Sequence, residues 1–400
     1  MCTKEHFIKD YGTWSSGNVN IDKIIRESQI NNVVSNLRWI PYDNFYDTKH
    51  MADNEYYTLY SARLRNYMIV SCEGEYEYHG PVALKELKDY RYDILEFIKA
   101  IKQIANDGSF YSYYITKFYG ISKNPSTQNY IIVMESHNDT IHSFLSDIFL
   151  KIKWDSKNDL LHQIIYALNI LHENNLVHCD LNSRNILTTK HVLYLITLID
   201  PGLCKLDNDL ILNSDNKNNT VYGSIPYIPP EALRGNEFTK EGDIYSFGGI
   251  MYEMVTGNQP FADRAHDTYL MIDICNGVRP KVPDMMLNLI PKCYLDLMYR
   301  CWDDDPSKRP NSYELTNIIY SWNINEEFVD VDLDRERMNK SHEQKLLRSL
   351  YSFHPQSCYI SRNIHTLYKL QDLLEDIKSG RCADPNLYTY DMSKRIDLET

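Results

Sequence analysis

His178-Cys179-Asp180-Leu181-Asn182-Ser183-Arg184-Asn185 is the most informative segment of this 400-residue chain. It directly follows residues 159–173, whose apolar side chains recur at the spacing of one face of a helix. Asp200-Pro201-Gly202 comes fifteen residues after its end. By itself, a segment rich in Asp and Asn can also be a turn between two strands, because these residues are common in turns.

The side chains of this segment suit phosphoryl transfer, a reaction that needs mainly positioning and charge neutralisation from a protein. Asp180 can accept or orient the hydroxyl group that attacks the phosphorus. Asp200 and Asn185 can hold Mg²⁺ on the phosphates through a carboxylate and an amide oxygen. The segment therefore predicts a site that contains these three residues.

Four further segments along the chain support this interpretation, since each carries a recognisable motif and they occur in one order. They are Val-Ala-Leu-Lys at 82–85, Gly-Ser-Ile-Pro-Tyr-Ile-Pro-Pro-Glu at 223–231, Asp-Ile-Tyr-Ser-Phe-Gly at 243–248, and Cys-Trp-x3-Pro-x2-Arg-Pro at 301–310. A lone Lys at the end of a strand is usually only a surface charge, but the order and spacing of these motifs favour a functional Lys85.

These motifs resemble those of the eukaryotic protein kinases, and the texture of the chain is nearest the tyrosine-kinase-like group. The segment at 178–185 resembles the catalytic loop H-R-D-x-x-x-x-N, and the one at 82–85 resembles the strand V-A-I-K. The resemblance implies an α+β, two-lobed fold with a small strand-rich N-lobe, one regulatory αC helix and a larger helical C-lobe. It also implies an ATP- and Mg²⁺-dependent transfer of the γ-phosphate to a protein hydroxyl.

The resemblance also assigns roles to single residues. Lys85 would contact the α- and β-phosphates, with Asp180 at the substrate hydroxyl, and Asn185 and Asp200 at the metal. Met134 would be the gatekeeper beside the adenine site. Residues Glu135 to His137 would form the hinge, so Glu135 and His137 are expected at the nucleotide.

Two structural contacts are implied in the same way. Asp243 would brace the backbone of the catalytic loop. Glu231 would form a buried, hydrogen-bonded ion pair with Arg309.

The expected domain organisation has three parts. Residues 1–37 form a polar extension, residues 38–323 the kinase domain with lobes at 38–136 and 137–323, and residues 324–400 a tail that is partly helical or disordered. We expect both flanks to be flexible and polar, apart from a short helix at 21–35 and weak helical patterns near 341–352 and 364–378. Within the domain, strands are expected at 67–71, 80–87 and 130–134, and further helices at 91–105, 240–256, 266–276, 291–302 and 312–322.

The nucleotide-binding lobe departs from the family pattern. Residues 54–59 stand where kinases have a glycine-rich loop, yet they contain no glycine, so side chains block the close approach of backbone N–H groups to phosphate. Tyr56 or Tyr57 could fold into the pocket instead. On the expected αC helix, Ala100 stands where the partner carboxylate of Lys85 belongs, and Glu96 lies one turn away.

Two more departures lie near the catalytic loop. Cys179 replaces the Arg that normally reads a phosphate on the activation segment. Asp200-Pro201-Gly202 resembles the metal motif D-F-G of the protein kinases, but Pro201 replaces its Phe and restricts the backbone conformation of Asp200.

Two functions therefore stay open at this point. The four residues nearest the phosphates, metal and hydroxyl are present and favour an active kinase, with Ser/Thr favoured over Tyr because Ser224 occupies a position typical of serine/threonine enzymes. Against this, Arg184 stands at a position where many tyrosine kinases have Arg. The altered N-lobe favours a pseudokinase that acts as a scaffold or allosteric binding module. A metabolic phosphotransferase is disfavoured by the Pro-Pro-Glu segment.

Composition narrows the partners and the location. The chain has a net charge of −13 and no dense Lys/Arg cluster, so a nucleic-acid partner is not expected. No apolar run reaches the ~18 residues that a membrane-spanning helix needs. Nine scattered cysteines without a C-x-x-C pair indicate reduced thiols and a cytoplasmic protein. The expected partner is a protein substrate or a signalling protein.

Overall fold

The computed structural model divides the chain into two units. The strand-rich unit contains residues 1–144, 159–178 and 183–207, and the helical unit contains residues 145–158, 179–182 and 208–400. The structure describes residues 14–31, 37–53, 57–65, 67–71, 74–78, 80–88, 114–137, 139–149, 151–188, 197–199, 205–206, 218–337 and 353–388.

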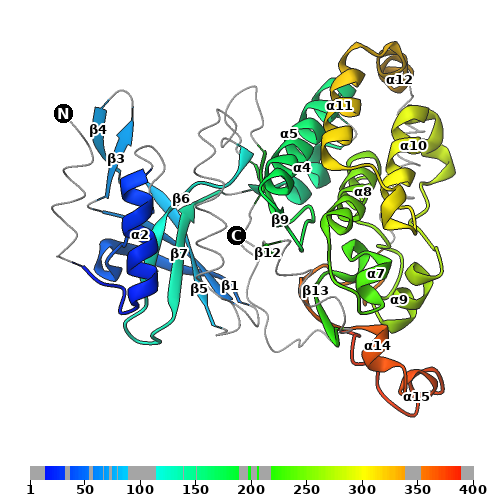
Figure 1. Ribbon diagram of the computed structural model, residues 1–400. Coiled ribbons are helices and arrows are strands. Elements are labelled where there is room, and N and C mark those ends of the chain that lie inside the picture. The colour runs from blue at the N-terminus through cyan, green and yellow to red at the C-terminus, as the bar shows by residue number, and fades with distance from the viewer. Residues whose placement is uncertain are drawn as a thin grey trace. The chain divides into compact units, whose positions relative to one another are not determined.

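The strand-rich unit is built on a five-stranded antiparallel sheet with the strand order β1-β2-β5-β7-β6 (Figure 1). The strands are β1 (Phe45–Asp53), β2 (Tyr57–Leu64), β5 (Pro81–Leu87), β7 (Tyr130–Glu135) and β6 (Phe118–Lys123). A separate hairpin joins β3 (Tyr67–Ser71) to β4 (Gly74–Tyr78), and the single turn η1 (Tyr42–Asn44) precedes β1. The strands expected at 67–71, 80–87 and 130–134 are confirmed.

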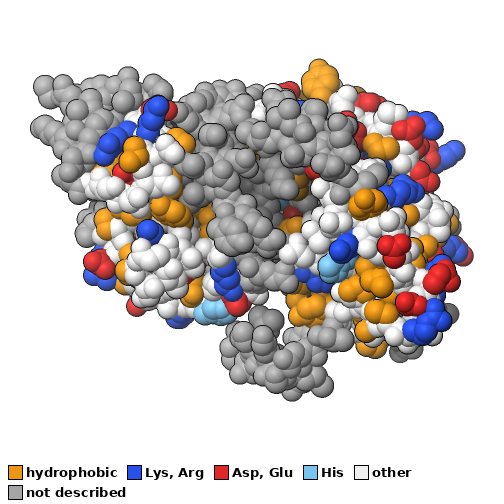
Figure 2. All heavy atoms as spheres, turned by 60° about the horizontal axis from the view of Figure 1, so that its bottom comes forward, with side chains coloured by type: hydrophobic (Ala, Val, Ile, Leu, Met, Phe, Trp, Pro, Cys, Tyr) orange, Lys and Arg blue, Asp and Glu red, His pale blue; other side chains and the backbone are white. Residues whose placement is uncertain are grey.

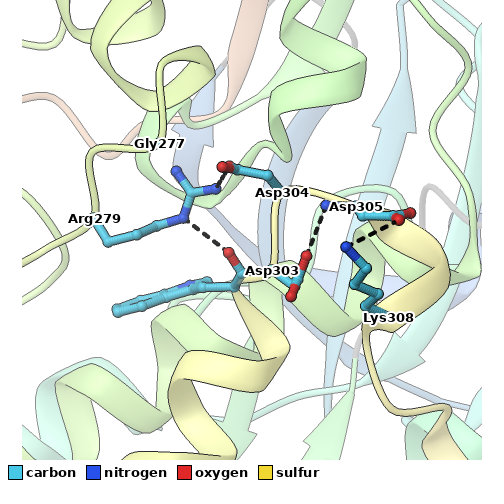
Figure 3. Close-up of a pocket in the computed structure, with 7 residues that line it drawn as sticks. Gly277, Arg279, Asp303, Asp304, Asp305 and Lys308 are labelled. Atoms are coloured by element: carbon cyan, nitrogen blue, oxygen red, sulfur yellow. Dashed lines mark hydrogen bonds and ion pairs between the residues drawn. The ribbon is translucent and has the colours of Figure 1, made fainter.

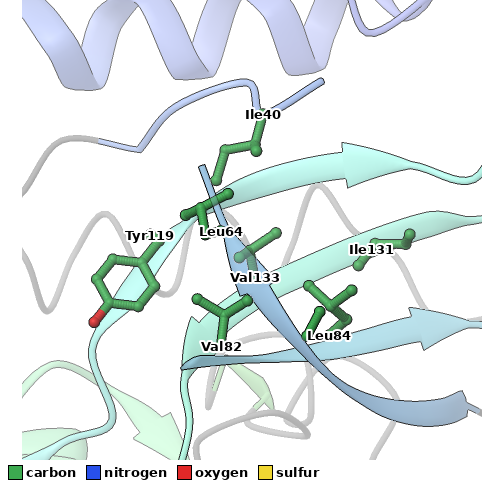
Figure 4. Close-up of a cluster of buried hydrophobic side chains, with 8 residues drawn as sticks. Ile40, Leu64, Val82, Leu84, Tyr119, Ile131 and Val133 are labelled. Atoms are coloured by element: carbon green, nitrogen blue, oxygen red, sulfur yellow. The ribbon is translucent and has the colours of Figure 1, made fainter. Parts of the chain in front are cut away.

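Successive residues of β5 face opposite sides of the sheet, and this alternation decides what surrounds Lys85. Val82 and Leu84 point into a cluster with residues of β2, β6 and β7, which Figure 4 shows converging from neighbouring strands. The cluster consists of Ile40, Ala62, Leu64, Val82, Leu84, Tyr119, Ile131 and Val133. Lys85 therefore shares the opposite face with Ala83 and Leu87.

Helix α2 (Val19–Asn31) covers that opposite face of the sheet, as Figure 1 shows. Ile21 and Ile25 are four positions apart, so they lie on one side of the helix, and both are fully buried against Leu87 and other sheet residues. The cluster consists of Ile21, Ile25, Leu37, Leu87, Ile121, Ile132 and Met134. The short helix expected at 21–35 is observed as α2 at Val19–Asn31, and two buried isoleucines fix it on the sheet despite its polar surroundings.

Shorter elements complete the strand-rich unit. β8 (Asp139–Thr140), β10 (Ile186–Thr188) and β11 (Thr197–Ile199) form a three-stranded sheet, and β9 (Leu176–Val177) pairs with β12 (Lys205–Leu206). Helices α4 (Ile141–Ile148) and α5 (Trp154–Glu173) have residues in both units.

The helical unit is centred on α8 (Lys240–Thr256), whose residues are buried almost throughout. A helix that is buried on all sides lies in the middle of a bundle, and the buried polar residues of α8 include Asp243. The other helices are α7 (Pro230–Leu233), α9 (Thr268–Cys275), α10 (Lys292–Cys301), α11 (Ser312–Ser321) and α12 (Glu326–Glu336), with single turns η3 (Ile225–Tyr227), η4 (Asp284–Leu289), η5 (Pro306–Lys308) and η6 (Trp322–Ile324). The helices expected at 240–256, 266–276, 291–302 and 312–322 are confirmed to within two residues.

An aromatic cluster joins the start of α5 to the later helices of this unit. The Trp154 ring lies 5.1 Å from Tyr294 and 5.3 Å from Phe328, and Trp322 lies 5.5 Å from Tyr294. These edge-on and tilted contacts bury large apolar surfaces and each adds roughly 0.5–1.5 kcal/mol beyond the burial itself. On the face of this unit that Figure 2 presents, acidic and basic side chains are interspersed.

The C-terminal tail also belongs to the helical unit. Strand β14 (Arg362–His365) pairs antiparallel with β13 (Thr220–Gly223), and α14 (Leu367–Leu370) and α15 (Leu374–Lys378) follow it. Cys358, Ile364, Leu370 and Ile377 are buried. The expectation of a flexible flank is therefore wrong for residues 353–388, and the helical pattern near 364–378 is a strand end followed by two short helices.

Three expectations lie outside the described residues: the αC helix at 91–105, the helical pattern at 341–352 and the glycine-free segment at 54–56. The lobe limits at 136/137 and 323/324 stay predictions. Among the residues that the structure does describe, no helix is both long and apolar enough to cross a membrane.

Candidate active site

The segment around Asp180 is braced by α8. The backbone N–H of Cys179 donates a hydrogen bond of 3.0 Å to Oδ1 of Asp243, which is fully buried in the first turn of that helix. Cys179 has a φ of 66°, a left-handed conformation that costs a non-glycine residue roughly 1–2 kcal/mol. The hydrogen bond to a buried carboxylate offsets this cost, and it confirms the bracing contact expected of Asp243.

Asp180 is 7% exposed, and its carboxylate accepts hydrogen bonds from two side chains of the helical unit. Nδ2 of Asn182 lies 3.2 Å from Oδ1 of Asp180 and 3.1 Å from its backbone carbonyl. The hydroxyl of Ser361 donates to the same Oδ1 at 2.8 Å. Asn182 therefore orients the carboxylate from within the loop, while Ser361 comes from the tail.

Lys85 is 3% exposed and lies on β5 of the strand-rich unit. Its Nζ is 4.3 Å from the centroid of the Tyr57 ring, within the range of a cation–π interaction. Tyr57 is the first residue of β2, directly after the segment where kinases carry glycines. Of the two tyrosines expected to fold inward, Tyr57 lies against Lys85, and Tyr56 is outside the described residues.

The expected hinge residues lie at the end of β7. Glu135 is the last residue of that strand, and its N–H donates to the carbonyl of Lys117 at 2.9 Å. The His137 side chain is buried, with Nε2 3.7 Å from Oε2 of Glu135. Met134 is buried in the cluster under α2. The roles of these three residues at the nucleotide stay predictions.

Asn185 is half-buried and directly precedes β10. The loop before it is held by the N–H of His142, which donates to the carbonyl of Ser183 at 3.1 Å. Lys85, Glu135, His137 and Asn185 belong to the strand-rich unit and Asp180 to the helical unit. Asp200, Pro201, Glu96 and Ala100 lie outside the described residues.

Glu231 and Arg309 form the expected buried ion pair. Nη1 and Nη2 of Arg309 donate to Oε1 and Oε2 of Glu231 at 2.7 and 2.8 Å, the bidentate geometry of a strong pair. The guanidinium also donates to the carbonyls of Asp303 and Glu241, both at 2.9 Å. The Tyr245 ring lies 5.2 Å away, and burial raises the pKa of Tyr245 to about 12. This prediction is confirmed.

A shallow pocket that the structure describes lies elsewhere in the helical unit (Figure 3). Its charged side chains largely satisfy one another: Arg279 pairs with Asp304, and Nζ of Lys308 lies 3.5 Å from Oδ2 of Asp305. Its lining residues are Gly277, Arg279, Trp302, Asp303, Asp304, Asp305 and Lys308. None of the predicted site residues is among them, so we do not assign the nucleotide to it.

The protein kinases are the class of proteins with these features. They combine a sheet that carries a buried lysine with a helical unit that carries a braced aspartate loop. The family model described as protein tyrosine and serine/threonine kinase matches residues 49–319, so the chain belongs to this family. The motifs predicted that this chain is most similar to the tyrosine-kinase-like group of protein kinases. The relatives of the chain confirm this prediction.

Several curated relatives are named as serine/threonine-protein kinases. Mouse receptor-interacting serine/threonine-protein kinase 4 is 31% identical over 51% of this chain and 26% of its own length. A probable serine/threonine-protein kinase of Dictyostelium discoideum is 32% identical over 60% of this chain and 17% of its own, and one of Clostridium acetobutylicum is 30% identical over 65% and 39%. The chain thus spans well under half the length of these relatives.

Members of this family generally use ATP and Mg²⁺, and the donor chemistry of the chain fits that use. Mg²⁺ prefers oxygen ligands and is usually held by one or two protein groups together with substrate phosphates. Asn185 offers an amide oxygen and Asp200 a carboxylate. Among the described residues there is no group of three or more His, Cys, Asp and Glu side chains that would hold a metal on its own.

Proposed function

We propose that this chain is a serine/threonine-protein kinase that transfers the γ-phosphate of ATP to a hydroxyl group of a protein. The observation that carries the proposal is the setting of Asp180, a buried carboxylate oriented by Asn182 on a loop that Asp243 braces. Such preorganisation is what phosphoryl transfer asks of a protein. The names of the relatives support serine and threonine over tyrosine.

In the proposed reaction, the acceptor hydroxyl attacks the γ-phosphorus, and the bond from that phosphorus to the bridging oxygen of ADP breaks. Asp180 orients the hydroxyl and takes up its proton. Lys85 would contact the α- and β-phosphates, and Glu135 and His137 would border the adenine. Asn185 and Asp200 would hold Mg²⁺, which neutralises charge on the phosphates when bound.

We further propose that the protein acts in intracellular signalling in the cytoplasm, on a protein substrate and without a nucleic-acid partner. The acidic balance of the chain and its scattered cysteines support this setting.

One observation favours a second candidate function, a pseudokinase that binds partners without catalysis. The Tyr57 ring lies against Lys85, the side chain that should contact phosphate. A ring in this place competes with the nucleotide for the ammonium group. The proposed kinase therefore binds ATP more weakly than a kinase with a glycine-rich loop.

The decisive experiment incubates the full chain with casein, Mg²⁺ and radiolabelled ATP, and compares it with Asp180→Asn. The Asn side chain keeps the shape and an acceptor oxygen but cannot take the proton. We expect phosphoserine and phosphothreonine in casein, and a rate about 10²–10⁴-fold lower in the variant.

Equal, background-level rates in both proteins would favour the pseudokinase. Phosphotyrosine as the product would keep the kinase and overturn the choice of serine and threonine.

A further inference from the structure

The C-terminal tail brings a hydroxyl group within hydrogen-bonding distance of the Asp180 carboxylate. Oγ of Ser361 donates to Oδ1 of Asp180 at 2.8 Å across 181 positions of sequence, and both residues belong to the helical unit. A general base must lie about 2.6–3.2 Å from the hydroxyl whose proton it takes, and this distance meets that condition.

Other hydroxyl groups of the tail donate to backbone carbonyls. Oγ of Ser357 donates to the carbonyl of His354 at 2.9 Å, and Oγ of Ser379 donates to that of Asp376 at 3.2 Å. The hydroxyl of Thr366 donates to the carbonyl of Asn218 at 2.6 Å. These three hydroxyls donate to backbone carbonyls, whereas the hydroxyl of Ser361 donates to the carboxylate of Asp180, the predicted base.

Strand pairing positions Ser361 from its C-terminal side. Ser361 directly precedes β14, whose first residue, Arg362, is paired with Gly223 at the end of β13. A Cβ atom on Gly223 would lie 3.1 Å from Ile228 and 3.7 Å from Oδ1 of Asp180. The absence of a side chain there lets the paired strands pass close to the carboxylate.

Side-chain contacts position Ser361 from its N-terminal side. The hydroxyl of Tyr359 donates to the carbonyl of Pro260 at 2.9 Å, and its ring meets that of His266 edge-on at 4.7 Å. His266 in turn accepts a hydrogen bond of 2.9 Å from the N–H of Cys358. The residues on either side of Ser361 are thus held to the helical unit.

We propose that Ser361 is a phosphorylation site modified by its own chain. This inference rests on the proposed function, since Mg-ATP bound to the same chain supplies the phosphate. The Oγ atom of Ser361 attacks the γ-phosphorus, the bond to the bridging oxygen of ADP breaks, and Asp180 takes the proton. The products are phosphoserine 361 and ADP.

The modification also has a structural consequence. A phosphate on Ser361 carries about two negative charges beside the Asp180 carboxylate, and like charges at this distance repel. Phosphorylation therefore loosens β14 from β13 and frees Asp180 for other hydroxyl groups. Before it, Ser361 occupies the place of an external acceptor.

The first test is mass spectrometry of the full chain after incubation with Mg-ATP, compared with Ser361→Ala and with Ser357→Ala as the matched control. We expect phosphate on Ser361 in the wild type and in Ser357→Ala. Its first-order rate constant should not change on dilution. In a mixture with an isotopically heavy Asp180→Asn chain, the heavy chain should stay unmodified at Ser361.

Three results would overturn the inference. If casein is phosphorylated and Ser361 is not, the proposed function stands and this site falls. If neither is phosphorylated, both fall. If the heavy Asp180→Asn chain acquires the phosphate, the transfer runs between molecules and not within one.

A second test needs no nucleotide. In Ser361→Glu, a carboxylate replaces the hydroxyl beside Asp180, so amide hydrogen exchange at residues 362–365 should speed up by about tenfold or more. Ser357→Glu, in the same tail but bonded to His354, should leave that exchange unchanged. Equal rates of amide hydrogen exchange in the two variants would show that Ser361 is not hydrogen-bonded to Asp180 in solution.

Discussion

Lys85 in the strand-rich unit and Lys157 in the helical unit are buried to the same extent, 3% exposed each. Each ammonium group also lies over an aromatic ring, at 4.3 Å from Tyr57 and at 5.0 Å from Trp154. Burial and ring contact therefore do not distinguish the lysine of the proposed nucleotide site from a lysine of the core. The difference is sequence context, because Lys85 ends a Val-Ala-Leu-Lys strand motif and Lys157 lies in a helix.

The surroundings of the two lysines differ as well. Burial, together with the nearby Arg335, lowers the pKa of Lys157 to about 7, and Asp332 partly opposes the shift. Asp332 is already paired with Arg335 at 3.1 Å. Arg309, by contrast, is a buried cation with a carboxylate of its own. These three cations allow the comparison to be tested by mutation.

The largest effect is expected for the fully paired cation. Arg309→Ala would leave Glu231 buried and uncompensated, which should lower the free energy of unfolding by roughly 3–5 kcal/mol. Arg300→Ala is the matched control, because Arg300 pairs with Glu314 at 2.6 Å in a half-exposed setting, where such pairs contribute about 0–1 kcal/mol. Urea unfolding would measure both, and equal losses would contradict the view that pairing in the core decides the cost.

Lys157→Met should stabilise the protein at pH 7 by about 2 kcal/mol, since methionine fills the site without a buried charge. The sign with pH follows from the lowered pKa. Between about pH 7 and 10.5 the unfolded chain holds a proton that the folded chain releases, so wild-type stability rises with pH through this window.

The gain from Lys157→Met should therefore be full at pH 7 and shrink toward pH 10. Thermal unfolding at several pH values checks this, with the exposed Lys151→Met as control. A gain that grows with pH would contradict the lowered pKa.

The smallest effect is expected at Lys85, the lysine of the proposed nucleotide site. Tyr57→Val removes the ring from Lys85 and keeps a residue that favours strands, so ATP should bind about 3–30-fold more tightly if a cation–π contact of about 0.5–2 kcal/mol competes with phosphate. Tyr46→Val is the matched control, because the Tyr46 ring lies 4.7 Å from the guanidinium of Arg65 in the same unit. Calorimetric titration with Mg-ATP measures both. Weaker binding in Tyr57→Val would mean that the ring supports the site.

Sequence motifs predicted the family, the braced loop and the Glu231–Arg309 pair, because each depends on a few residues at fixed spacing within elements that have their own periodicity. The long apolar helices of the helical unit were predicted for the same reason. Helix α2 and the contact between Tyr57 and Lys85 could not be predicted as firmly. Ile21 and Ile25 are two of five apolar residues in a helix that is otherwise polar, and their burial depends on a sheet that forms from distant residues.

The hydrogen bond from Ser361 to Asp180 was determined by the tertiary structure alone. The pairing of β14 with β13 is made by backbone N–H and carbonyl groups, which every residue except proline possesses, so residues 362–365 carry no motif that names their partner. Only the closure of a chain segment of more than a hundred residues brings that strand to Gly223. The residues proposed to perform the chemistry can thus be recognised from short sequence motifs. The hydroxyl group that contacts Asp180, in contrast, is determined by long-range packing.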